Sequence, residues 1–63
     1  MSLYNRVVEI VNRECYNDKV VVESDDWSIV IKYKYRGLRL PYITVYICTI
    51  DKIIVSFLQS LTD

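Results

Sequence analysis

The chain has 63 residues, enough for a single small domain covering residues 1–63, and a domain of this size buries only about 60% of the surface that its unfolded chain exposes. Its 8 basic and 8 acidic side chains cancel, and a hydrophobic content of 52% excludes an intrinsically disordered chain. No apolar run approaches the roughly 18 to 20 residues of a membrane span, and residues 1–14 do not resemble a signal peptide, so we expect a cytoplasmic protein with no membrane partner.

Residues 2–16 are predicted to form a helix that begins at Ser2, a favourable N-cap residue. Polar side chains, including Arg6, fall on one arc of the helical wheel, where we expect them to face solvent. The apolar arc is expected to pack on the core. Its members are Leu3, Tyr4, Val7, Val8, Ile10, Val11 and Cys15.

Three strands are predicted to follow this helix. Residues 19–23 form a short β-branched run, and the polar segment 24–26 makes a turn. Residues 27–35 alternate between two faces, as do residues 42–50 after a hairpin connection at 36–39. The side chains expected to point toward the helices are Trp27, Ile29, Ile31, Tyr33 and Tyr35 in the second strand and Ile43, Val45 and Ile47 in the third.

The last segment, residues 52–61, is compatible with a helix or with a fourth strand. A helix is favoured because its bulky apolar residues then share one arc, whereas a strand would place them on both faces. Asp51 stands at the expected N-cap position. The predicted fold is therefore α+β: an N-terminal helix, a three-stranded antiparallel meander and a C-terminal helix. Both helices cover one face of the sheet, and the other face stays open.

The helix–strand–strand–strand–helix order is similar to that of double-stranded RNA-binding domains, which are also of comparable length. That family carries basic residues at the start of its second helix and brings the loop between its first two strands to the RNA minor groove. The corresponding positions here hold Lys52 alone and the acidic segment 24–26. The resemblance is one of topology, and we do not assign the chain to that family.

The composition argues against catalysis. The chain has no histidine, which removes the commonest general base and the usual zinc ligand sets, and its 1 glycine cannot build a phosphate-binding loop. Asp25 and Asp26 are interpreted as turn residues that accept backbone hydrogen bonds. Cys15 and Cys48 are expected to be buried and reduced, without a disulfide. We therefore predict a non-enzymatic protein with no metal, cofactor or small-molecule substrate.

The open face of the sheet is the predicted site of function. Its mixture of aromatic, aliphatic and polar side chains suits a protein interface, although many antiparallel sheets leave one such face in water. The leading hypothesis is a protein-interaction module, either a homodimer or a small viral or mobile-element accessory protein with a larger partner. Acidic residues within 18–26 and basic residues within 32–39 are suited to pair between two copies. The predicted interface residues are Val30, Lys32, Tyr42, Thr44 and Tyr46.

A nucleic-acid-binding protein is the alternative hypothesis. Basic side chains of the second hairpin would neutralise phosphates, and the interleaved Tyr33 and Tyr35 would stack on unpaired bases. Strand alternation, however, separates the lysines from the tyrosines. An ordinary solvated hairpin, whose lysines discourage pairing between sheet edges, explains the same pattern. The candidate basic residues are Lys32, Lys34, Arg36 and Arg39.

Overall fold

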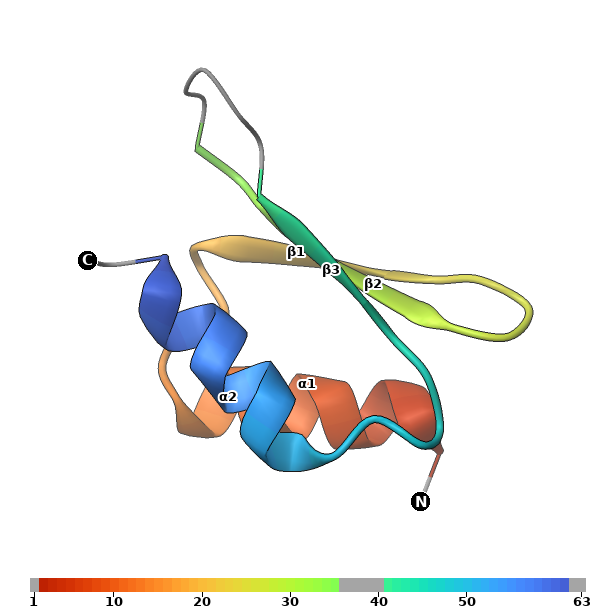
Figure 1. The fold of residues 1–63 in the computed structure, drawn as a ribbon. Helices are drawn as coiled ribbons and strands as arrows, with labels where there is room; N and C mark the ends of the chain where they lie inside the picture. The colour runs from red at the N-terminus through yellow and green to blue at the C-terminus, as the bar shows by residue number, and fades with distance from the viewer. Residues whose placement is uncertain (1, 36–40, 62–63) are drawn as a thin grey trace.

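A computed structural model describes residues 2–35 and 41–61 of the chain. Figure 1 shows two helices on one side of a twisted three-stranded sheet, as the sequence predicts. The segment that was compatible with a fourth strand is helical, and the predicted α+β fold is confirmed. The elements are α1 (Leu3–Arg13), β1 (Val20–Ser24), β2 (Ile29–Tyr33), β3 (Tyr42–Val45) and α2 (Asp51–Ser60).

The strands form an antiparallel meander in the order β1-β2-β3. One row of inward-facing side chains crosses the sheet through Val22, Ile31 and Ile43. Since Ile31 is fully buried at the centre of β2, this row marks the face that the helices cover. The core consists of Val7, Ile10, Val11, Tyr16, Val20, Ile29, Ile31, Val45, Ile54 and Leu58.

Helix α1 begins where the sequence predicts and ends earlier. Ser2 is the N-cap, and its Oγ accepts a hydrogen bond of 3.1 Å from the backbone N–H of Asn5. The helix stops at Arg13 because Cys15 turns the chain at a φ of 65°. The N–H groups of Cys15 and Tyr16 then donate to the carbonyl groups of Asn12 and Val11, at 3.1 and 2.9 Å, which is a Schellman motif.

This helix end corrects one predicted burial. Cys15 is exposed, because the left-handed turn carries it off the apolar arc, and the next residue, Tyr16, is the one that enters the core. Cys48 was also expected to be buried and is exposed as well. Both cysteines are free thiols, so the predicted absence of a disulfide between them agrees with the structure.

Two large apolar residues expected beneath the helices lie outside the core. Trp27 is 86% exposed: it precedes β2, in the part of the hairpin that extends past the helix layer in Figure 1. Ile47 is 82% exposed because β3 ends at Val45, well before the predicted end at residue 50. The chain turns there instead, with the N–H of Thr49 donating to the carbonyl of Tyr46 at 3.0 Å.

The beginning of α2 also differs from expectation. Ile50 occupies the N-cap position and makes no side-chain capping bond, while Asp51 is the first helical residue. The Asp51 carboxylate instead accepts a hydrogen bond of 2.8 Å from Nε of Arg6, in α1. A negative charge in the first turn of a helix interacts favourably with the positive end of the helix dipole, so Asp51 stabilises α2 without a capping hydrogen bond.

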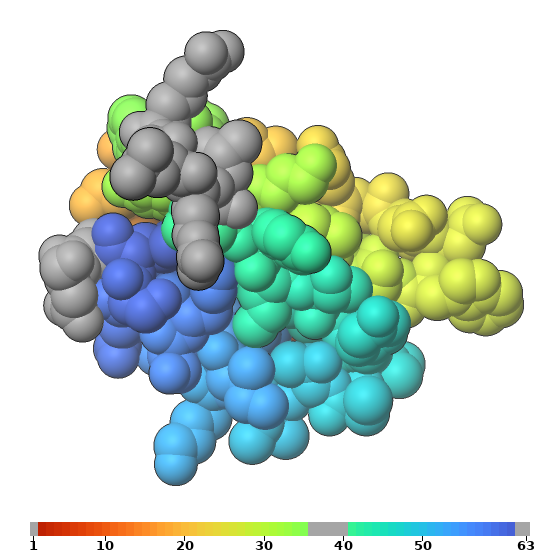
Figure 2. Space-filling view, turned by 45° about the horizontal axis from the view of Figure 1, so that its top comes forward, coloured from red at the N-terminus to blue at the C-terminus, as the bar shows by residue number. Residues whose placement is uncertain are grey.

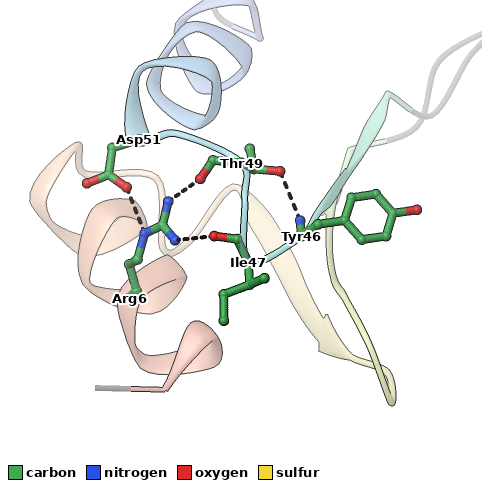
Figure 3. A network of polar contacts seen from close by, with 5 residues as sticks. All are labelled: Arg6, Tyr46, Ile47, Thr49 and Asp51. Atoms are coloured by element: carbon green, nitrogen blue, oxygen red, sulfur yellow. Dashed lines mark hydrogen bonds and ion pairs between the residues drawn. The ribbon is translucent and has the colours of Figure 1, made fainter.

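Arg6 connects α1 to the chain that leads into α2 (Figure 3). Besides Asp51, its guanidinium donates to the carbonyl groups of Thr49 and Ile47, the latter at 3.5 Å. Tyr46 and Thr49 close the same turn through a 3.0 Å hydrogen bond from the Tyr46 N–H to the Thr49 Oγ1. The sequence placed Arg6 on the solvent-facing arc; in the structure it holds the turn after β3 in place.

We expect Arg6→Met to lower the free energy of unfolding by about 1–3 kcal/mol, because methionine keeps the aliphatic stem and removes the donors to the turn. Urea unfolding followed by circular dichroism measures the change. Arg13→Met is the matched control, since Arg13 pairs only with its neighbour Glu14 at 3.6 Å, and should change stability by less than about 0.5 kcal/mol. Equal effects of both substitutions would contradict this role of Arg6.

Cys15→Gly is expected to stabilise the protein by about 1 kcal/mol, because glycine adopts a positive φ without the steric cost that a Cβ atom brings. The same unfolding assay, under reducing conditions, measures the gain. Cys48→Gly serves as the control: Cys48 is equally exposed but has no positive φ, so glycine there only adds freedom to the unfolded chain and should not stabilise. A loss of stability in Cys15→Gly would refute the explanation.

Candidate functional site

The face of the sheet opposite the helices carries two rows of side chains from all three strands. One row places Val21, Lys32 and Tyr42 opposite one another. The other row is Glu23, Val30 and Thr44. The structure therefore brings together, on one uncovered face, four of the five residues that the sequence proposed for an interface; that role itself stays a prediction.

Apolar and polar side chains alternate across this face, with Lys32 central in the first row and Val30 central in the second. Tyr42, on the edge strand β3, is 65% exposed, and Val21, on the other edge strand, is also exposed. Between them, Nζ of Lys32 lies 2.9 Å from Oε1 of Glu23. Both partners are about half exposed, so the pair adds about 0–1 kcal/mol to stability and chiefly cancels charge within the face.

Tyr46, the fifth predicted interface residue, lies beyond the sheet. It follows the last residue of β3 and belongs to the turn that ends at Thr49. Its side chain is 50% exposed, and Figure 3 shows the ring pointing away from the polar contacts of Arg6. Strand alternation had placed Tyr46 in register with Tyr42 and Thr44, but no partner strand pairs with it in the ladder.

Opposite charges lie toward the two ends of β2. The hairpin between β1 and β2 carries Asp25 and Asp26, which precede the start of β2. Lys34 follows the end of β2 and is exposed, and its backbone N–H donates to the Lys19 carbonyl at 2.9 Å. Asp25 and Asp26 therefore lie at one end of β2 and Lys34 at the other. Asp18, which the sequence grouped with the acidic residues, lies instead at the Lys34 end, where its carbonyl accepts a 3.4 Å hydrogen bond from the Tyr35 hydroxyl.

The basic set proposed for nucleic-acid binding is only partly placed. Lys32 is ion-paired, and Arg36 and Arg39 lie outside the described residues. Tyr33 is half-buried on the helix side, and its ring meets that of Tyr35 edge to face, with centroids 5.4 Å apart. Lys32 and Tyr33 thus face opposite sides of the sheet, and nucleic-acid binding stays an untested prediction.

Asp25 accepts a backbone hydrogen bond in the turn, as the sequence predicts, whereas no such bond to the Asp26 carboxylate is found among the described residues. The N–H of Asp26 donates to Oδ1 of Asp25 at 2.9 Å, and the N–H of Asp25 donates to the Ser28 carbonyl at 2.8 Å. Within residues 2–35 and 41–61, no three Cys, Asp or Glu side chains gather as a metal site. Over the same residues, neither helix is long and apolar enough to span a bilayer.

Sequence reasoning missed a groove at the tip of the first hairpin. Its volume is about 380 Å³, and its walls come from the start of α1, the β1–β2 turn and the turn after β3. The residues that matter for its chemistry are Tyr4, Asp25, Asp26, Trp27 and Ile47. Trp27 was the sequence signal that could have revealed this groove. A tryptophan directly after a polar turn lies at the very end of its strand, where a helix layer often does not reach.

We compared the chain with protein-family models, with curated proteins and with solved structures, and none of the three comparisons gave a match. Two surfaces of the molecule are therefore candidates for function, the open sheet face and the hairpin-tip groove. One is the uncovered surface of a twisted sheet, and the other is a concavity between three segments.

Proposed function

We propose that this protein is a non-enzymatic interaction module that forms an antiparallel homodimer through the open sheet face. The observation that carries the proposal is the uncovered face itself, with Tyr42 and Val21 exposed on its two edge strands. Two such faces packed together would remove these apolar groups from water. They would also give each sheet a second covered side, which supplements the small one-sided core.

The size of the face indicates how far the contact must extend. Three strands of about five residues span roughly 15 Å in each direction. A stable interface buries about 800 Å² on each partner, which is about a sixth of the 4682 Å² that this chain exposes. The strands alone are too small for that, so the dimer contact includes the flanking segments at both ends of β2.

Charge determines the relative orientation of the two copies. The acidic hairpin tip and Lys34 lie toward opposite ends of β2, so a parallel arrangement would bring like charges together. An antiparallel arrangement, related by a two-fold axis, sets each acidic end against the partner's basic end. Such charged contacts at the rim of an interface determine the relative orientation of the partners and raise the association rate, and they contribute less to affinity.

We expect the protein to dimerise, and Tyr42→Glu to weaken dimerisation at least tenfold, because the substitution places a charge at an apolar contact. Sedimentation velocity over a range of protein concentrations measures the association. Ile53→Glu is the matched control: Ile53 is an exposed apolar residue of α2, in the helix layer, and its substitution should leave association unchanged. A wild-type protein that stays monomeric at millimolar concentration would disprove the proposed self-association.

Lys34→Glu is expected to weaken the dimer about two- to fivefold, the size of an exposed ion pair, and the dimer should also weaken as salt rises. Lys52→Glu is the control, because Lys52 is an exposed lysine at the start of α2, in the helix layer. The same sedimentation series reports both variants. If the two substitutions have equal effects, net charge rather than antiparallel pairing governs the association.

A further inference from the structure

The hairpin-tip groove gathers exposed apolar side chains from three separate segments of the chain. Trp27 comes from the β1–β2 hairpin, Ile47 from the turn after β3 and Tyr4 from the first turn of α1. In Figure 2 the hairpin tip, in yellow, projects from the body of the molecule next to the blue-green turn that follows β3. Segments distant in sequence therefore converge on one concave surface.

The exposure of these side chains is unusual for their type. Trp27 and Ile47 are 86% and 82% exposed, and Tyr4 is 44% exposed. A single exposed apolar residue is common on protein surfaces, but a group that lines a concavity marks a binding site more often than chance. Tryptophan and tyrosine are also the residues most enriched among those that dominate binding energy.

Two carboxylates line the same groove. Asp25 and Asp26 are both exposed acidic side chains of the groove lining. Within the described part of the chain, no lysine or arginine forms an ion pair with either of them, and only Asp25 accepts a hydrogen bond, from the Asp26 N–H. An occupant that combines an apolar group with a positive charge would match both features of the groove.

We infer that the groove binds a segment of another protein in which a bulky apolar side chain is followed or preceded by lysine or arginine. The apolar side chain would lie between Trp27 and Ile47, and the basic side chain would face Asp25 and Asp26. A volume of about 380 Å³ is near the lower end of ligand pockets, so the groove accepts one or two side chains of a short segment.

The apolar part of this groove lies apart from the proposed homodimer contact, whereas Asp25 and Asp26 at the hairpin tip take part in both. Ile29, which is buried on the helix side of β2, and Tyr4, on α1, both line this groove. The groove therefore opens on the side of the sheet that the helices occupy, whereas Tyr42 lies on the opposite face. Tyr42→Glu, which disrupts the dimer, should therefore leave the groove intact, and Trp27→Ala should leave the dimer intact.

The test uses a displayed library of random peptides, selected on the immobilised full-length chain. A tryptophan-free peptide from the selected pool is then labelled with fluorescein, and its affinity is measured by anisotropy for each variant. Binding of the unlabelled peptide is followed through Trp27, which is the only tryptophan of the chain and so reports directly on the groove. Circular dichroism confirms that each variant is folded.

The selected peptides are expected to combine an apolar residue with lysine or arginine, and to shift the emission of Trp27. Trp27→Ala should lower affinity at least about tenfold, as expected for a dominant contact, and Ile47→Ser should also weaken binding. Asp26→Asn should lower affinity about two- to fivefold and reduce its salt dependence. Tyr42→Glu is the control variant and should bind as the wild type does.

Three results would overturn the inference. The first is a selection in which no peptide binds the wild type better than it binds Trp27→Ala. The second is a selected pool without enrichment of lysine or arginine, or one that binds Asp26→Asn as tightly as the wild type. The third is loss of binding in Tyr42→Glu with unchanged binding in Trp27→Ala, which would move the peptide site to the open sheet face.

Discussion

Burial of one face of the sheet beneath two helices is the constraint on which the rest of this structure depends. Val7 and Ile10 from α1 and Ile54 and Leu58 from α2 form one buried core with Ile31 at the centre of β2. Two short helices can cover only one side of three strands, so the same packing that stabilises the fold leaves the other side in water. The proposed function is a direct consequence of this one-sided core.

Arg6 adds a polar connection to that apolar core. Its donors reach the carbonyl groups of Ile47 and Thr49 and the carboxylate of Asp51, so one side chain on α1 positions the whole connection from β3 to α2. That connection forms one wall of the hairpin-tip groove through Ile47. The geometry of the groove therefore depends on a residue that does not line it.

The two surfaces would work together in a bifunctional assembly. Dimerisation through the open face would place two hairpin-tip grooves at opposite ends of one symmetric particle, because the two-fold axis sends one tip in each direction. Two linked grooves would bind a partner that displays repeated basic and apolar segments more tightly than one groove alone, since the second contact becomes intramolecular. A dimer of this 63-residue chain would thereby contact two separated segments of one partner.

The sequence by itself determined the order of elements and the two faces of the sheet. Helical spacing in α1 and α2, and alternation around Ile29, Ile31 and Val45, are local patterns that hold wherever the elements pack. Only the tertiary structure determined where along each strand the side chains are no longer buried by the helices. The hairpin extends past the helix layer at Trp27, and a turn follows β3 at Ile47. Both outcomes depend on contacts between residues that are distant in sequence. Periodicity assigns a side chain to a face, but only packing shows whether anything lies against that face, which is why sequence reasoning found the open sheet face and missed the groove.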